Sequence, residues 1–196
     1  MNYYIADTHF GHFNIIKHDA NNGCKKFSSI EEHDNLIIEN WNSVVKQTDN
    51  VYILGDFSWL YGRETKEIIE KLNGQKFLIK GNHDRWSKDG ACKKLFQGIY
   101  DIKQIEDNGR QVILSHFPIM MWSGQHRGVI HLYGHVHMTD EWKLYTQSLD
   151  SVNDYFKDKE KKGYTGCPPA LAFNVGCMLS YMDYTPRTLK EILENN

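Results

Sequence analysis

Six short runs of apolar residues recur along the chain, and each run ends at a polar residue. The runs are rich in Val, Ile, Leu, Tyr and Phe, a composition that is typical of strands buried within a sheet. Their pattern therefore predicts β-strands at residues 3–6, 51–54, 77–79, 112–114, 129–133 and 171–173.

Helical patterns lie between or after several of these strands. Residues 30–46 place apolar side chains on one helical face, and Ser28 with Glu31, or Ser29 with Glu32, offers a capping box at the start. Residues 64–72, which stop before Asn73-Gly74, predict a second helix. Residues 186–193, with a proline near the first helical position, predict a third.

The order of these elements indicates the fold class. Strands and helices alternate early in the chain and more closely spaced strands follow, which favours an α/β layered domain with helices outside a central sheet system. A chain of 196 residues fits one domain, residues 1–196, and we find no linker, internal repeat or low-complexity segment. The polar run at residues 154–162 mixes both charge signs and is interpreted as a solvated loop or helix.

Charge and cysteine content narrow the function classes. Lys and Arg total 23 against 25 Asp and Glu, so the overall charge gives no support for a nucleic-acid-coating or membrane-surface protein, although a local basic patch stays open. No secretory signal or membrane span of about 20 apolar residues is found, so we expect a soluble protein with no membrane partner. The cysteines at 24, 92, 167 and 177 form no C-x-x-C pair, which favours reduced thiols in the cytoplasm.

Side chains able to bind metals cluster directly after five of the predicted strands. Residues i and i+2 of an extended chain point to the same side, so Asp7 with His9, and His135 with His137, can each direct both side chains into one pocket. Glycines that precede several of these residues permit sharp turns and close backbone approach. We therefore expect one rim built from Asp7-Thr8-His9, Gly55-Asp56, Gly81-Asn82-His83-Asp84, Ser115-His116 and Gly134-His135-Val136-His137.

The chemistry of this set indicates the kind of metal. Carboxylate and amide oxygens with imidazoles, and no thiolate, suit Mn, Fe, Zn or similar cations rather than a structural cysteine-rich zinc site. Two cations about 3.5–4 Å apart need a shared anionic ligand. Asp56, which stands alone after its strand, is the natural candidate for that ligand.

Taken in order, these motifs resemble the motif set of the calcineurin-like metallophosphoesterase superfamily. The motifs run from residue 7 to residue 137, and the segments at 7–12, 174–176 and 184–186 also resemble the small, uncapped bacterial and phage members. The resemblance implies an α/β (α+β) fold of four layers, an αββα sandwich in which two mixed β-sheets are flanked by helices. It also places the site at the strand ends.

The same resemblance implies a set of roles and two divalent metal ions, with Mn preferred and Fe, Zn, Ni, Mg or Co as alternatives. One metal would be held by Asp7, His9, Asp56 and His137, and the second by Asp56, Asn82, His116 and His135. A hydroxide bridging the two metals would attack phosphorus in line. His83 would contact the phosphate and protonate the leaving oxygen, with Asp84 or another carboxylate orienting it.

The chain also departs from some relatives. Phe57-Ser58-Trp59 follows Asp56, where Ser/Thr protein phosphatases of the superfamily continue with Asp-Arg, so a phosphoprotein substrate is not expected. A cation that clamps the phosphate would come from Arg85 or Arg127. His12 either touches the substrate or orients a metal ligand.

Other histidines and tryptophans lie off the motif positions. We interpret His18, His33, His126 and His131 as structural or solvent-exposed. Most tryptophans are expected to pack, with Trp86 and Trp122 lying nearest the rim, where a flat group could meet them.

Three functions stay open at this point. The leading one is a hydrolase, a phosphatase or phosphodiesterase, acting on a small phosphate ester or nucleotide. The second is a nuclease or nucleic-acid end-processing phosphatase with the same metals, which the near-neutral charge does not favour. The third is a non-catalytic protein-interaction scaffold, which a missing ligand would favour, whereas all the expected ligands are present here.

Overall fold

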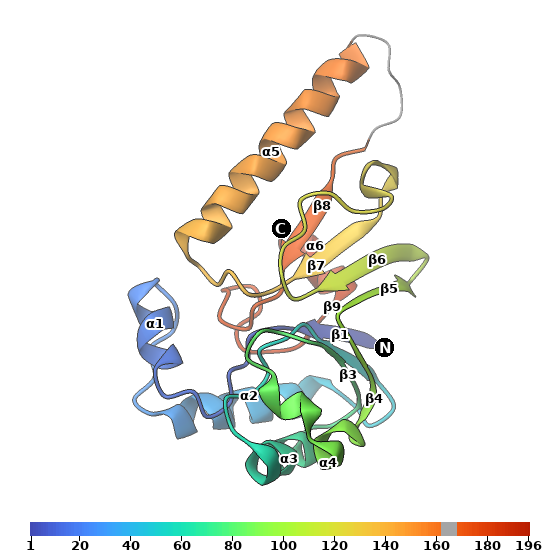
Figure 1. The fold of residues 1–196 in the computed structure, drawn as a ribbon. Helices are drawn as coiled ribbons and strands as arrows, with labels where there is room; N and C mark the ends of the chain where they lie inside the picture. The colour runs from blue at the N-terminus through green and yellow to red at the C-terminus, as the bar shows by residue number, and fades with distance from the viewer. Residues whose placement is uncertain (162–167) are drawn as a thin grey trace.

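The computed structural model describes residues 1–161 and 168–196, which form two mixed β-sheets (Figure 1). The first sheet has the order β4 (Phe96–Tyr100), β3 (Gln75–Ile79), β2 (Asn50–Ile53), β1 (Asn2–Ile5), β9 (Arg187–Thr188). The second has the order β5 (Ile102–Asp107), β6 (Arg110–Ser115), β7 (Ile130–Tyr133), β8 (Leu171–Asn174). Neighbouring strands are parallel except at the β9 and β5 edges, where the pairing is antiparallel.

Helices flank the two sheets (Figure 1). On the side of the first sheet lie α2 (Ile30–Val44), α3 (Gly62–Lys71) and the short α4 (Gly90–Lys93), and on the side of the second lies α5 (Asp140–Lys161). The remaining helices are α1 (Ile15–Asn21), α6 (Leu189–Glu194) and the 3-10 turns η1 (Arg85–Lys88) and η2 (Gln125–Arg127). The predicted arrangement of two mixed sheets flanked by helices is confirmed.

The alternation of side chains along β6 shows how the layers are held together. Val112 and Leu114 lie in the main core together with Ile5 of β1, so this core fills the space between the two sheets. Ile113 points to the opposite face and packs in a second cluster with Tyr145 of α5. Because successive strand residues point to opposite faces, one short strand can bury side chains in both layers.

All six predicted strands are present, with ends displaced by no more than two residues. The predicted helices at 30–46 and 64–72 correspond to α2 and α3. At the start of α2 the Ser29 side chain accepts a hydrogen bond from the Glu32 backbone N–H, whereas the Glu32 carboxylate accepts from Ser28. The two serines therefore share the capping function.

The prediction of a helix at 186–193 is wrong at its start. Arg187 pairs with Tyr4 and Thr188 with Tyr3, so the segment first adds the edge strand β9. Thr188 then caps α6 through a complete capping box with Glu191. The cap is visible in the local sequence. The edge pairing is not, because it depends on β1, which lies far away in the sequence.

Several elements had no clear sequence signal. The edge strand β5 alternates between exposed and partly buried positions, and β4, which precedes it in the chain and lies at the edge of the other sheet, is mostly half-buried. The polar run at 154–162 forms the end of α5 as far as residue 161. Cys24, Cys92 and Cys177 are free thiols, whereas the interpretation of Cys167 falls outside the described residues.

Within residues 1–161 and 168–196, none of the helices is both long enough and apolar enough to cross a lipid bilayer.

Candidate metal centre

The carboxyl ends of β1, β2, β3, β6 and β7 meet at one edge of the two sheets. The segment after β8 joins the sheets there, because Val175 donates its N–H to the Tyr133 carbonyl at 2.7 Å and accepts from the Ala6 N–H at 2.8 Å. Asp7 is thereby brought against the end of β7, where its Oδ2 accepts the His135 N–H at 2.9 Å. Residues far apart in the sequence thus share one rim.

Backbone geometry at this rim differs from the sequence-based argument. The φ angle is positive at Asp7 (57°), His9 (45°), Asp56 (50°), His135 (72°) and His137 (43°). The left-handed region costs a non-glycine residue about 1–3 kcal/mol, and such residues gather at functional sites. The side chains of each pair do reach one site, as expected, but not as parts of an extended chain, because the chain turns sharply at these residues.

The first cluster of ligand atoms contains Asp7, His9 and His137, which lie within 4.8 Å of one another. The Nε2 atoms of His9 and His137 are 3.3 Å apart, and all three side chains are buried. The Asp7 Oδ1 atom is buried and has no hydrogen-bond partner among the described residues. An orphaned carboxylate oxygen beside two converging imidazole nitrogens is a donor set that fits a divalent cation.

The second cluster contains Asp56, His116 and His135. The His116 Nε2 atom lies 3.5 Å from Asp56 Oδ2 and 3.0 Å from Asn82 Oδ1. The other ring nitrogen of His116, Nδ1, lies 2.9 Å from the Leu54 carbonyl oxygen and donates to it. That bond leaves Nε2 as the ring nitrogen that faces the cluster, where it would bind a cation in its deprotonated form.

Asp56 lies between the two clusters. Its Oδ2 atom is 3.9 Å from His9 Nε2 in the first cluster and 3.5 Å from His116 Nε2 in the second. Burial acts to raise the pKa of Asp56, but its hydrogen bond and charge interaction with His116 outweigh burial and hold the pKa at about 2. The carboxylate is therefore ionised at neutral pH and is available to two cations at once.

Burial dominates the electrostatics of the other ligand candidates. It raises the pKa of the Asp7 carboxyl to about 6. It also lowers the pKa of His9, and the charge of His137 lowers that pKa further. Burial also acts to lower the pKa of His116, but Asp56 and Asp7 outweigh it and raise the pKa to about 9. Asp7 and Asp56 are two buried carboxylates at one site, and bound cations would neutralise their charge.

Asp19, on α1, was not identified from the sequence. Its carboxylate is 3% exposed, and its Oδ1 lies 3.0 Å from His137 Nδ1 and 3.2 Å from His18 Nδ1. A carboxylate on Nδ1 orients the ring of His137 so that Nε2 faces His9. Asp19 also raises the pKa of His137 against the lowering effect of burial. A single acid on a short helix carries no motif that would reveal this role.

The structure places Asp84 in a structural position. Its buried carboxylate accepts the backbone N–H groups of Asp56 at 3.0 Å, Phe57 at 2.9 Å and Gly81 at 2.7 Å. These bonds hold together the loops that follow β2 and β3. No hydrogen bond between the side chains of Asp84 and His83 is found in the described part of the chain, so the expected orientation of the His83 ring by Asp84 has no contact to support it.

His83 lies over the clusters with a side chain that is 34% exposed. Its Nε2 atom is 3.9 Å from Asp56 Oδ2, and its backbone N–H donates to Asp56 Oδ1 at 2.9 Å. His12 stacks in parallel on Trp59 with ring centroids 4.0 Å apart, and Trp59 in turn contacts the His83 ring at 4.4 Å. A hollow of about 340 Å³ is lined by His12 and His83 and by the ligand residues His9, Asp56, His135 and His137.

Some of the remaining residues expected at the site lie near the rim, and others lie away from it. Arg85 lines a cavity that it shares with His83, whereas Arg127 precedes β7 and lies at the opposite end of that strand from His135. Trp86 and Trp122 are buried in the cores, and Trp59, which we expected to pack, is 41% exposed. His18, expected to be structural or exposed, has an exposed side chain that lines the hollow.

Comparison with known proteins agrees with this geometry. The family model described as calcineurin-like phosphoesterase matches residues 3–173. The chain belongs to the calcineurin-like phosphoesterase family. Membership of this family supports metal-dependent phosphoesterase activity in general, a hydrolysis of phosphate esters, and the described residues contain the clusters of candidate metal ligands that such activity requires.

Proteins with similar sequences come from an archaeon and from mycobacterial phages. An uncharacterized protein of Methanocaldococcus jannaschii is 35% identical over 155 residues, which cover 77% of this chain and 78% of that protein. The gene 66 protein of Mycobacterium phage L5 is 31% identical over 166 residues, or 69% and 76% of the two chains. A crystal structure of a protein of unknown function from Aquifex aeolicus matches 100% of this chain and 99% of its own, with 27% identity and a TM-score of 0.67.

Proposed function

We propose that this chain hydrolyses phosphomonoesters or phosphodiesters by using two divalent cations that share Asp56. The observation that carries the proposal is the position of Asp56 Oδ2, which lies within 3.9 Å of a ring nitrogen from each of the two clusters. An ionised carboxylate shared by two sets of oxygen and nitrogen donors is the arrangement that a dinuclear site needs.

Each cation would have its own set of ligands in addition to Asp56. Asp7, His9 and His137 would hold one cation, and Asn82, His116 and His135 would hold the other, with Mn²⁺ the preferred metal. The orphaned Asp7 Oδ1 and the 3.0 Å approach of Asn82 Oδ1 to His116 Nε2 support this division. Oxygen and nitrogen donors without thiolates suit Mn²⁺ and its neighbours.

Bound cations would activate water and neutralise charge on the phosphoryl group. The task left to His83 is to donate the proton on Nε2 to the oxygen of the departing alcohol. The geometry supports this role, because the His83 backbone is fixed by Asp56 Oδ1 while its ring faces the hollow. His83 thus lies next to the bond that breaks without being needed to hold a metal.

The test compares two variants of the Mn²⁺-loaded protein on an aryl phosphate monoester and diester. His83→Ala should lower kcat by about a hundredfold or more and leave metal content unchanged, because only proton donation is lost. Asp56→Ala should lose bound metal and activity together. His126→Ala, which changes a histidine at the far end of β7, is the control. Parent-like turnover in both site variants would refute the proposal.

A further inference from the structure

A second, smaller cavity shares His83 with the hollow above the metal ligands. It has a volume of about 110 Å³ and is lined by Trp59, Leu60, Tyr61, His83, Arg85 and Trp86. The larger hollow contains Asp56 and the ligand histidines. A substrate whose phosphate lies over Asp56 therefore extends past His83 into the smaller cavity if its leaving group lies on the His83 side.

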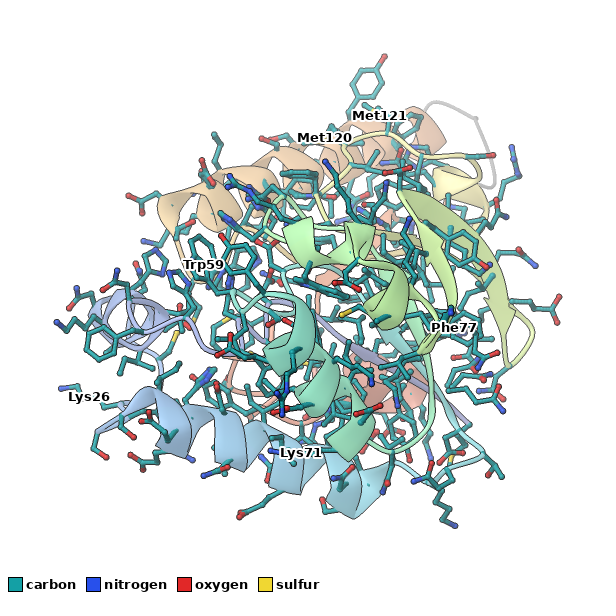
Figure 2. All side chains as sticks on the ribbon, turned by 60° about the horizontal axis from the view of Figure 1, so that its bottom comes forward. Lys26, Trp59, Lys71, Phe77, Met120 and Met121 are labelled. Carbon is teal, nitrogen blue, oxygen red and sulfur yellow. The ribbon has the colours of Figure 1, made fainter. Side chains whose placement is uncertain are left out.

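The walls of the smaller cavity are largely aromatic, and two of the aromatic residues are exposed to solvent. Trp59 is 41% exposed and Tyr61 is 68% exposed. Both belong to the short loop that follows Asp56 and precedes α3. Figure 2 shows Trp59 between the blue segment that contains α1 and the green segment that contains η1. The parallel stack of Trp59 on His12 fixes the orientation of the indole. Large aromatic surfaces held open beside a reactive histidine are typical of a ligand contact.

The charge of the cavity limits the kind of ligand. Arg85 is exposed, and no carboxylate among the described side chains of residues 1–157 and 168–196 forms an ion pair with it. The described lining contains neither Asp nor Glu. Arg85 therefore repels a quaternary ammonium group, which aromatic cages otherwise bind. A guanidinium group beside aromatic rings instead suits a flat ring that carries hydrogen-bond acceptors, and the volume is too small for a long acyl chain.

We propose that this cavity binds a heteroaromatic ring carried by the leaving group, so that the preferred substrates are phosphate esters of nucleosides. This inference rests on the proposed function, in which His83 protonates the leaving oxygen. Trp59 and Tyr61 contact the ring through their aromatic surfaces, and Arg85 donates hydrogen bonds to its acceptors. The sugar spans the distance between His83 and the ring.

The experiment removes the ring while keeping the sugar and the phosphate. The kcat/KM of the Mn²⁺-loaded protein is measured for adenosine 5′-monophosphate and for ribose 5-phosphate, and binding of adenosine and of ribose is measured by calorimetry on the same protein. The parent should prefer the nucleotide by about tenfold or more, and it should bind adenosine more tightly than ribose.

Three substitutions separate the cavity from the rest of the site. Trp59→Ala and Tyr61→Ala should each reduce the ratio of the two kcat/KM values toward one and weaken adenosine binding, and Trp59→Phe should keep part of the preference. Phe117→Ala is the matched control, because Phe117 is an aromatic residue that is 49% exposed but contacts His135 instead of His83. It should leave the ratio unchanged.

The outcomes distinguish this inference from the proposed function. Equal kcat/KM values for both esters in the parent, or a ratio that Trp59→Ala and Tyr61→Ala leave intact, would overturn the inference while hydrolysis itself stands. If the parent hydrolyses neither ester and also leaves the aryl phosphate monoester and diester intact, the proposed function fails. The calorimetry then decides the inference alone, since adenosine and ribose binding of equal strength would refute it.

Discussion

The Nδ1 atom of His137 lies 3.0 Å from the Oδ1 atom of Asp19, so a carboxylate on helix α1 orients a candidate metal ligand that follows β7. The two residues are 118 positions apart in the sequence. The contact connects a helix at the rim of the site to the first ligand cluster. It also explains why a buried acid lies at this position although the described side chains offer it no lysine or arginine partner.

Replacement of Asp19 should weaken metal binding. Outer carboxylates that hold a ligand histidine typically change metal affinity by about 10–100-fold, so Asp19→Ala should raise the Kd for Mn²⁺ by roughly that factor. Asp19→Asn should lose less, because the amide oxygen still accepts from Nδ1. Calorimetric titration with Mn²⁺ measures both variants.

A suitable control for this prediction is Asp107→Asn. Asp107 is also a buried acid, 5% exposed, but it accepts a hydrogen bond from the Tyr4 hydroxyl at the β5–β6 hairpin, away from the candidate ligands. If Asp19→Ala binds Mn²⁺ as tightly as the parent, the proposed orientation of His137 is wrong.

Asp84→Asn should destabilise the fold. The Asp84 carboxylate accepts three backbone N–H groups, and the amide that replaces it turns an NH₂ group toward one of those donors. Hydrogen bonds to charged groups contribute about 1.5–3 kcal/mol each, so the free energy of unfolding should fall by at least about 2 kcal/mol. Urea denaturation measures this change, and an unchanged midpoint would show that the three bonds contribute little.

Gly81→Ala should disturb Asp56 directly. A Cβ atom at Gly81 would collide with the Asp56 side chain and with the Asp56 backbone nitrogen, so either the loop or the carboxylate must move. We expect loss of Mn²⁺ binding and a lower melting temperature. Gly90→Ala is the matched control, because nothing lies within 4 Å of a Cβ atom there. Equal metal binding by the two variants would argue against a fixed position for Asp56.

His131 should make the protein sensitive to acid. Its side chain is fully buried, its Nδ1 lies 3.1 Å from the Ile113 carbonyl, and its Nε2 accepts the Ile119 N–H at 3.0 Å. Burial lowers the pKa of His131 to about 4, against 6.5 for an exposed histidine. The folded state disfavours protonation of His131. Its contribution to the free energy of unfolding is therefore fully present above pH 6.5 and decreases as the pH falls toward 4.

The comparison of the parent with His131→Gln isolates this effect. The difference between their free energies of unfolding should shrink by up to about 3 kcal/mol between pH 7 and pH 4, because only the parent carries the group that titrates. Other acids and histidines are common to both proteins and cancel in the difference. Parallel stability curves over this pH range would contradict the assigned role of His131.

The sequence predicted the strands well, and it singled out the residues that the structure brings together at the rim, because both depend on local patterns. A buried strand such as β2 is a run of apolar residues, and Asp56 follows it directly. The sequence could not predict the left-handed conformation of Asp7 or His135, because nothing in a local pattern distinguishes a ligand on a sharp turn from one on an extended strand. Those turns depend on contacts between the two sheets, such as the bond from His135 N–H to Asp7.

Contacts that join distant segments account for the other differences. Asp19 has a role only when α1 lies against the end of β7, and Asp84 has its role only when the loops after β2 and β3 meet. Trp59 is exposed because it lies over His12 and His83 at the rim, whereas tryptophans usually pack in cores. In each case the residue type is visible in the sequence, but its partner is fixed by the fold.

The most direct test of the central claim is a crystal structure of the protein grown with Mn²⁺, with the metal positions taken from anomalous scattering. The account predicts two Mn²⁺ ions about 3.5–4 Å apart that both contact Asp56. Asp7, His9 and His137 should surround one ion, and Asn82, His116 and His135 the other. A single ion, or two ions of which neither is bound by Asp56, would contradict it.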